Sequence, residues 1–377
     1  MKEKKNLDSI KKQIDQFKMM FKDNPVEEIK SGSWFTKILQ LVLSDSNNLS
    51  AEYFVRKYIG LDKEIVARRL IKTTSNHAAI AGGLAGAAAS AAELSTLLSG
   101  GMSLAAVGAV LIGEISYITY LQLKLIYEIS VIYNAKLDRN DPEDLITIFW
   151  YSLGINKWEE ASNAVLKAGP RSTEYLGRKA LRSGLRKSIR NVVGKLGGQK
   201  LAQKITEKAL LKFIVPGINI PIAASVNKVF TKKLGDNALK TFKRRAITLE
   251  SIDKLKEFER HFQLLSISLI YHIGIFDQKS KIDKVVEMQN TVVKYLNVNS
   301  GEEEIIDDLI SINFEDFCGI LSEIDDKNIS KILGDITIYT YHLTGSPNED
   351  KKLRELFHIL NLDFSENYVE TLKKKII

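Results

Sequence analysis

Four arginines recur every four residues between positions 178 and 190, a spacing that suits binding to a polyanion. Arg178, Arg182, Arg186 and Arg190 share one face of a helix, because residues four apart lie above one another along it. A stripe of leucine and isoleucine runs beside them. A helix lying in a membrane interface needs this pattern, with apolar residues at the acyl boundary and cations on the headgroups. The spacing therefore predicts a basic amphipathic helix.

The arginine stripe belongs to a strongly basic block in a chain whose formal net charge is +8. Residues 161–250 carry 20 Lys/Arg against 4 Asp/Glu, whereas residues 251–377 carry 15 against 23. The block ends in further cations: Lys232, Lys233, Lys243, Arg244 and Arg245. Such clustering indicates a polyanionic partner, which is anionic lipid, nucleic acid or the protein's own acidic tail. Nucleic acid is less favoured, because the block has few aromatic residues for base stacking and no reading-helix motif.

The side chains that usually perform catalysis or bind metals form no recognisable motif. The five histidines make no H-x3-H or HExxH spacing, and no GxSxG nucleophile elbow occurs. The single cysteine, Cys318, excludes an intrachain disulfide and a thiolate zinc cage, and a lone thiol is typical of a reducing compartment. The N-terminal residues lack the apolar run of a secretory signal. These features predict a cytoplasmic, non-enzymatic protein with no cofactor and no metal.

The stretch HAAIAGGLAGAAASAAELSTLLSGGMSLAAVGAVLIG, residues 77–113, is built largely of Ala, Gly, Ser and Leu. It lacks the Lys-Ser/Thr pair of a phosphate-binding loop and the first glycine of a dinucleotide fingerprint. Gly82, Gly86 and Ser90 are spaced four apart, which lets helices approach closely, and Gly100 and Gly101 could turn a hairpin.

Two interpretations of this Gly/Ala hairpin stay open. Residues 94–113 form a twenty-residue uncharged run, close to the ~20 residues that cross a bilayer. However, Glu93 opposes permanent insertion, since a carboxylate in lipid costs a few kcal/mol. A tightly packed helical pair inside a soluble bundle would have the same composition. We therefore expect either a buried helical pair or a hairpin that meets lipid conditionally.

The rest of the chain follows helical periodicity. In LDSIKKQIDQFKMMF, apolar residues recur at helical spacing at Leu7, Ile10, Ile14, Phe17 and Phe21. Alternating strand patterns are scarce, although DITIYTYHL (335–343) is rich in β-branched and aromatic residues and also fits a strand. The sequence predicts an all-α multi-helix bundle with a smaller C-terminal helical domain.

Three segments resemble the EcsC family of bacterial proteins: HAAIAGGLAG, EISYITYLQLKLIYEISVIYNAKLDRNDPED and IVPGINIPIAASVNKVFTKKLGDNALKTF. The resemblance covers roughly residues 55–245. The matching motif positions are Gln122, Tyr133, Pro216, Gly217, Asn227, Phe230, Thr231 and Gly235. Asn134 stands where a glycine is usual, which fits a left-handed helix end. The resemblance implies a non-catalytic cytoplasmic or membrane-associated protein, and the family is named for a gene beside an ABC transporter.

The tail more faintly resembles the TerB-like helical domains. In IGIFDQKSKIDKVVE, the acids that correspond to that family's are Asp277, Asp283 and Glu287, but the glycine that should follow the first is absent. The resemblance therefore implies a fold rather than a metal site. The expected organisation is N-terminal amphipathic helices in 1–54, an EcsC-like domain in 55–250 and an acidic helical domain in 251–377.

Together these features predict an accessory protein that docks on the cytoplasmic face of a bacterial membrane through the basic helix and the hairpin. The expected partners are anionic lipid and a transporter or another membrane protein. Peripheral binding or conditional insertion at the inner membrane would follow. Two alternatives stay open: a membrane-permeabilising effector, whose dye leakage Gly86→Leu should reduce, and a soluble scaffold for nucleic acid or protein.

Overall fold

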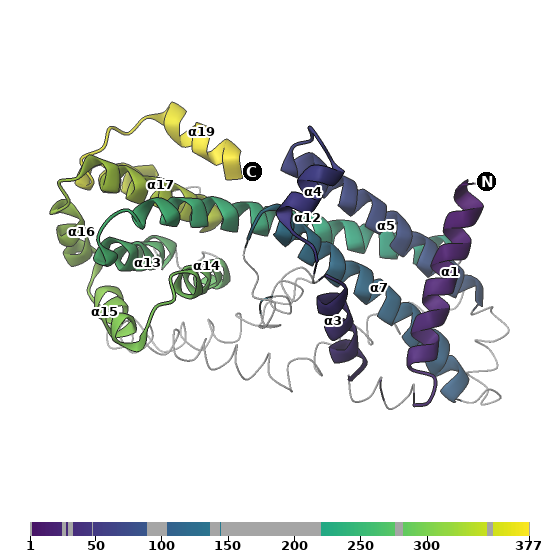
Figure 1. Ribbon diagram of the computed structural model, residues 1–377. Helices are drawn as coiled ribbons and strands as arrows, with labels where there is room; N and C mark the ends of the chain where they lie inside the picture. The colour runs from purple at the N-terminus through teal and green to yellow at the C-terminus, as the bar shows by residue number, and fades with distance from the viewer. Residues whose placement is uncertain are drawn as a thin grey trace. The chain divides into compact units, whose positions relative to one another are not determined.

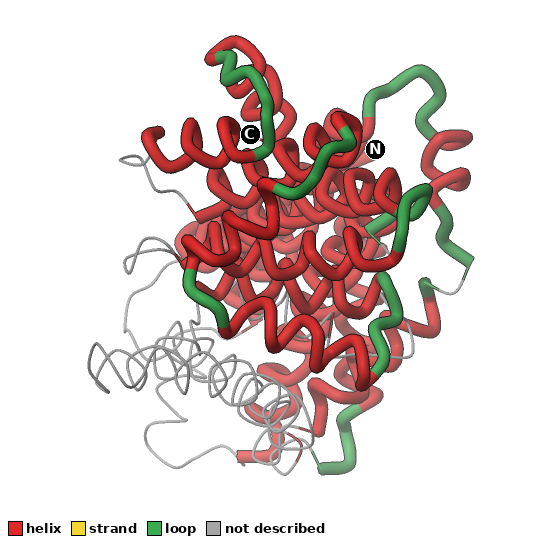
Figure 2. Tube along the Cα trace, turned by 90° about the vertical axis from the view of Figure 1, so that its left-hand side faces the viewer, coloured by secondary structure: helices red, strands yellow, loops and turns green. Residues whose placement is uncertain are grey.

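The computed structural model describes residues 2–24, 28, 33–46, 48–88, 104–135, 144, 220–275, 282–344 and 350–376. Within these ranges the chain forms α-helices joined by loops, with no strand (Figure 2). The predicted all-α fold is confirmed. The described residues group into two compact units that divide between Leu239 and Lys240.

The first unit is built around α7 (Leu104–Ile132). Helices α1 (Lys2–Met20), α3 (Ser33–Asp45), α4 (Ala51–Lys57) and α5 (Lys63–Ala88) contact α7, and α1 crosses α5 and α7 (Figure 1). Most side chains from Ile112 to Tyr133 are buried. A helix that is apolar on nearly all faces needs such a central place.

Helix α1 shows how the predicted amphipathic pattern is used. Ile10, Ile14, Phe17 and Phe21 are buried as predicted, whereas Leu7 remains 41% exposed. The Phe17 ring lies 5.7 Å from that of Tyr117, whose hydroxyl donates a hydrogen bond to Gln13 Oε1 at 2.7 Å. One face of α1 therefore packs on α7.

Helix α12 (Ile220–Leu255) runs for 36 residues and contributes to both units. Leu234 and Leu239 are buried in the first unit. Ile252 and Leu255 belong to the hydrophobic core of the second. The division between the units therefore falls inside a helix rather than in a loop.

The second unit surrounds α13 (Arg260–Ile275), which is buried from Gln263 to Gly274. Helices α14, α15 and α17 contact α13, while α18 and α19 pack on α17. The bounds of these and the remaining helix are α14 Ile282–Tyr295, α15 Ser300–Ser311, α16 Phe314–Ser322, α17 Lys327–Thr344, α18 Asp350–Ile359 and α19 Glu366–Ile376.

The segment DITIYTYHL, which also fits a strand, is helical and lies in α17. Ile336, Thr337 and Ile338 are fully buried, and the Thr337 hydroxyl donates to the Leu333 carbonyl at 2.9 Å. A helix buried on several sides tolerates β-branched residues, because packing outweighs their weak intrinsic preference for strands.

Candidate functional site

A buried polar seam joins α7 to α12 in the first unit. Gln122 Nε2 donates to Thr231 Oγ1 at 3.0 Å, and Asn227 Nδ2 donates to Glu114 Oε1 at 3.4 Å. All four side chains are at most 5% exposed. Because a buried polar group is costly without a partner, these bonds fix how the two helices pair.

Gly235 brings α12 against α5 and α7 just beyond this seam. A Cβ placed there would lie 2.7 Å from Ile71 Cγ1 and 3.1 Å from Leu125 Cδ2. Even alanine therefore requires the neighbouring side chains to shift. Gln122, Asn227, Thr231 and Gly235, four of the motif positions named in the sequence analysis, thus meet where α7 and α12 pack.

The other positions of that resemblance lie at the edge of this region or outside it. Phe230 is half-buried on α12, and Tyr133 is 8% exposed just after α7, where burial raises its pKa to about 12. Pro216 and Gly217 lie outside the described residues. Their place in the motif therefore stays a prediction from the sequence.

Asn134 ends α7 in the left-handed conformation, with φ of 50°. The Asn134 amide donates to the Val131 carbonyl at 3.0 Å, and the Ala135 amide donates to the Ser130 carbonyl at 2.9 Å. These bonds close the helix end as a C-terminal cap does. Asparagine therefore takes the conformation that glycine usually takes there.

Helices α5 and α12 of the first unit both expose lysines and arginines. We refer to the exposed Lys63, Arg68, Arg69, Lys72, Lys228, Lys232 and Lys233 together as the α5–α12 cationic face. Arg68 pairs with Glu64 at 2.6 Å, and Lys232 pairs with Asp236 at 3.5 Å. The hydrogen bonds that Arg68 donates to Glu64 raise the pKa of Arg68, and the charges of Glu64 and Asp236 raise it further. Since Arg68 is on α5 and Asp236 on α12, the two helices lie close together at this point.

Two exposed valines accompany the lysines of α12. Val226 is 40% exposed and Val229 is 53% exposed, beside the exposed Lys228, Lys232 and Lys233. Lys232 and Lys233 are thus exposed on α12, and their anion-binding role stays a prediction. Lys243, Arg244 and Arg245 lie further along α12, in the second unit, and are half-buried.

The other membrane elements predicted from the sequence are only partly described. Gly82 is buried in α5, beside the fully buried Ala78 and Ala81, and Gly86 also lies in α5. Outside the described residues lie Ser90, Glu93, Gly100, Gly101, Arg178, Arg182, Arg186 and Arg190. Among the described helices, none is both long and apolar enough to cross a bilayer.

A lysine–tyrosine cluster on α7 was not predicted from the sequence. Glu128 is half-buried, and burial raises its pKa while Lys124 and Lys57 oppose the shift. Lys124 donates to the Tyr120 hydroxyl at 3.3 Å, which donates to Asp45 Oδ2 at 2.6 Å. The four-residue spacing of Tyr120, Lys124 and Glu128 could have indicated that they share one face of α7. The sequence of α7 alone could not show that Asp45 of α3 and Lys57 of α4 join them.

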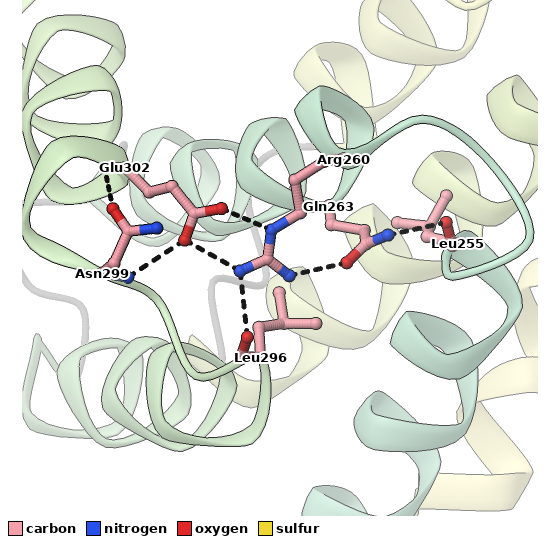
Figure 3. Close-up of polar contacts among 6 residues, drawn as sticks. All are labelled: Leu255, Arg260, Gln263, Leu296, Asn299 and Glu302. Carbon is pink, nitrogen blue, oxygen red and sulfur yellow. Dashed lines mark hydrogen bonds and ion pairs between the residues drawn. The ribbon is translucent and has the colours of Figure 1, made fainter.

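The second unit carries its best-connected polar network at the start of α15 (Figure 3). Arg260 bonds both carboxylate oxygens of Glu302, at 2.7 and 2.9 Å, and also donates to the Leu296 carbonyl and to Gln263 Oε1. Glu302 and Asn299 form a reciprocal capping box. These bonds, led by that of Arg260, lower the pKa of Glu302 to about 2. Arg260 thus ties the start of α13 to Leu296 and to Glu302 at the start of α15, and we call this Arg260–Glu302 network the clamp.

No described group of His, Cys, Asp or Glu side chains is arranged to hold a metal ion. Asp277 lies outside the described residues, and Asp283 and Glu287 are on α14. The ring of His272 lies 4.2 Å from that of Phe317 and its Nε2 contacts the Leu309 carbonyl at 2.8 Å. This histidine is buried in the core of the second unit.

Comparison with protein families, with curated proteins and with solved structures gives no match to this chain.

Proposed function

We propose that this is a non-enzymatic accessory protein that docks on the cytoplasmic face of a bacterial membrane by binding anionic lipid. The observation that carries the proposal is the α5–α12 cationic face, with the exposed Val226 and Val229 among its lysines. Cations beside small aliphatic side chains suit a headgroup layer above an acyl boundary. The predicted helix of Arg178–Arg190 adds charge of the same sign.

The charge of this face is sufficient for stable attraction to an anionic surface. Residues 63–72 and 228–239 carry seven Lys/Arg against two Asp/Glu. Both of those acids, Glu64 and Asp236, already pair within their own helices. Since each Lys or Arg near an anionic surface contributes about 1 kcal/mol, the face favours binding by several kcal/mol.

The Gly/Ala hairpin completes the proposal as the part that inserts or packs once the protein is docked. In α5, Ala78, Ala81 and Gly82 are buried in the helix bundle. Engagement of this segment with lipid would therefore require it to leave packed neighbours. A docked protein could then assist a transporter or another envelope system.

Vesicle flotation of the full chain tests the docking step. We expect binding to vesicles that contain phosphatidylglycerol, no binding to phosphatidylcholine alone, and loss of binding at high salt. The triple variant Lys228→Gln, Lys232→Gln, Lys233→Gln should bind on the order of 100-fold more weakly.

The matched control is Lys327→Gln, Lys331→Gln, Lys351→Gln, which removes three exposed lysines from the second unit. It should bind like the unaltered protein. Equal loss in both triple variants, or binding that is indifferent to lipid charge, would contradict the proposal. Co-purified nucleic acid with steep salt sensitivity and no lipid binding would instead support a nucleic-acid scaffold.

A further inference from the structure

The end of α4, the turn after it and the start of α5 each expose a large aliphatic side chain. Val55 is 65% exposed, Ile59 85% and Ile65 47%. Ile59 is the most exposed large apolar side chain in the described part of the chain. We call Val55, Ile59 and Ile65 the α4–α5 tip.

The tip has a defined shape, because its backbone is fixed on both sides. The side chain of Phe54 is buried, which turns its neighbour Val55 outward. The Tyr58 amide donates to the Phe54 carbonyl at 2.9 Å, and Gly60 takes a φ of 75° that only glycine adopts readily.

The start of α5 is fixed in the same way. The Glu64 amide donates to Asp62 Oδ1 at 2.7 Å, and Val66 and Ala67 are buried. Ile65 is therefore held on the outer side of the first turn of α5. The exposure of the tip follows from ordered structure on both sides of the turn.

Basic side chains surround the tip, while the acids near it are engaged locally. Arg56, Lys57, Lys63 and Arg69 are exposed. Asp62 begins α5, and the Ser50 hydroxyl bonds Glu52 and lowers its pKa. Residues 51–69 carry five Lys/Arg against three Asp/Glu, so the net charge around the tip is positive.

Two tyrosines stand at the base of the tip. Lys57 Nζ donates to the Tyr53 hydroxyl at 3.1 Å and lies 5.2 Å from the centre of the Tyr53 ring and 5.6 Å from that of Tyr58. Both tyrosines are half-buried. Tyrosine beside lysine is typical of the level at which lipid headgroups meet water.

We infer that the α4–α5 tip is a second lipid-contacting site, in which Ile59, Val55 and Ile65 enter the acyl boundary and the flanking cations bind anionic headgroups. The inference rests on the proposed function, since it assumes that the protein docks on anionic lipid. It adds a contact that the cationic face alone does not supply. Lys63 and Arg69 of α5 are counted in both surfaces.

Lipid fits this site better than other partners of the same charge. Nucleic acid would contact the cations but would leave Ile59 and Val55 in water, because base stacking needs aromatic faces. Protein interfaces have cores depleted of charge and enriched in aromatic and Met anchors. The exposed aliphatic side chains of the tip, with exposed Lys and Arg nearby in the chain, fit neither kind of partner.

A polarity-sensitive dye placed at the tip tests the inference directly. In a Cys318→Ser background, Ile59→Cys is labelled with a nitrobenzoxadiazole dye and mixed with phosphatidylglycerol vesicles. We expect a blue shift and increased emission, as the dye leaves water. The control is Ile305→Cys, which labels α15 of the second unit at a position 49% exposed, and no spectral change is expected there.

The outcomes separate this inference from the proposed function. If the labelled protein floats with the vesicles but the dye at 59 stays in water, docking is supported and the tip site is wrong. If the protein does not float, both are wrong. An equal shift at 59 and 305 would overturn the tip site by showing nonspecific adsorption.

An unlabelled variant supplies an independent measurement. Val55→Ser, Ile59→Ser should weaken binding to phosphatidylglycerol vesicles about tenfold, because less apolar surface leaves water. Both side chains are exposed, so folding should be unchanged, as circular dichroism can verify. A variant that binds as the unaltered protein does would refute the tip site. Concentration-dependent dimerisation that this variant abolishes would reassign the surface to self-association.

Discussion

The side-chain networks described above lie in different positions in the two units, although the second unit also buries polar side chains between helices, as His272 of α13 does against the Leu309 carbonyl of α15. In the first, polar groups are buried between helices, where Gln122 meets Thr231 and Asn227 meets Glu114. In the second, the main network lies at a helix start, where Arg260 and Glu302 close over the end of α14 and the beginning of α15 (Figure 3). A buried bond specifies which helices pair, whereas a cap specifies where a helix begins.

The same difference affects the surfaces of the two units. The caps of the second unit use Asn299, Asn313 and Asp326, so several of its polar and acidic residues are engaged in local structure. The first unit buries Gln122, Asn227, Thr231 and Gly235 and exposes lysines and arginines on α5 and α12. The comparison predicts that substitutions in the buried contacts of the first unit cost more than substitutions in the caps of the second.

The largest effect is expected at Gly235. Gly235→Val should lower the free energy of unfolding by about 3 kcal/mol, because the added atoms collide with the buried Ile71 and with Leu125. Urea unfolding measures the cost, and hydrogen exchange of the full chain should show lost protection in α5 and α7. Gly319→Ala is the control, since a Cβ there meets nothing within 4 Å. Unchanged protection in Gly235→Val would mean that close approach of α12 is unnecessary.

A smaller effect is expected at the polar seam. Gln122→Leu should cost about 2 kcal/mol, because the hydroxyl of Thr231 loses its buried donor. The double variant Gln122→Leu, Thr231→Val should cost less than the sum of the single variants, since both polar groups are then gone. Strict additivity in urea unfolding would show that the two side chains do not act as a pair.

The clamp of the second unit should contribute less. Arg260→Met should cost about 1 kcal/mol at neutral pH, because the Arg260 side chain is 38% exposed and water screens the pair. Hydrogen exchange should localise the loss to α13 and α15. A cost above that of Gln122→Leu would reverse the comparison between the units.

The same clamp predicts a pH dependence. Glu302 has a pKa of about 2 in the folded protein, below its ordinary value of 4.5. A lowered carboxyl pKa stabilises the fold above the unfolded pKa, and this stabilisation is lost as the pH falls from about 4.5 towards 2. In urea unfolding across this range, Glu302→Gln should lose less stability than the unaltered protein. Parallel curves would indicate that Glu302 does not carry the effect.

The smallest effect is expected at Glu128. Burial raises its pKa, so ionisation disfavours the folded state as the pH rises through that pKa. Glu128→Gln should therefore stabilise the first unit at pH 7 by less than about 0.5 kcal/mol, with no gain at acidic pH. The exposed Glu304→Gln serves as the control. Destabilisation at pH 7 would show that the attraction of Lys124 and Lys57 outweighs burial.

Periodicity was sufficient to predict the all-α fold and the buried face of α1. Periodicity could not assign DITIYTYHL to a helix or to a strand, because the intrinsic preferences of its residues do not separate the two. The burial of Ile336 and Ile338 depends on helices distant in sequence. The left-handed Asn134 was predictable, since the signal is local. These cases show that features set by neighbouring residues can be predicted from the sequence, whereas packing between distant helices cannot.

The candidate sites show the same contrast between local features and long-range contacts. The exposure of Lys232 and Lys233 could be predicted, because a charged side chain is costly to bury without a partner, whereas their anion-binding role stays a prediction. The pairing of Gln122 with Thr231 joins residues 109 positions apart, and no helical spacing reports such a contact. Ile59 was missed because isoleucine is ordinarily a core residue, and only the turn at Gly60 shows that it faces water.

Helix α12 has a consequence for how the chain acquires its structure. Its first part is buried with α5 and α7, and its last part, from Ile252 to Leu255, lies in the other core. Starting a helix costs more than extending one, so whichever end packs first becomes the template from which the other grows. Assembly of one unit therefore lowers the entropic barrier for the other, and we expect the protein to refold with cooperativity that extends across residues 239 and 240. We expect this cooperativity to be lost when either unit is expressed alone.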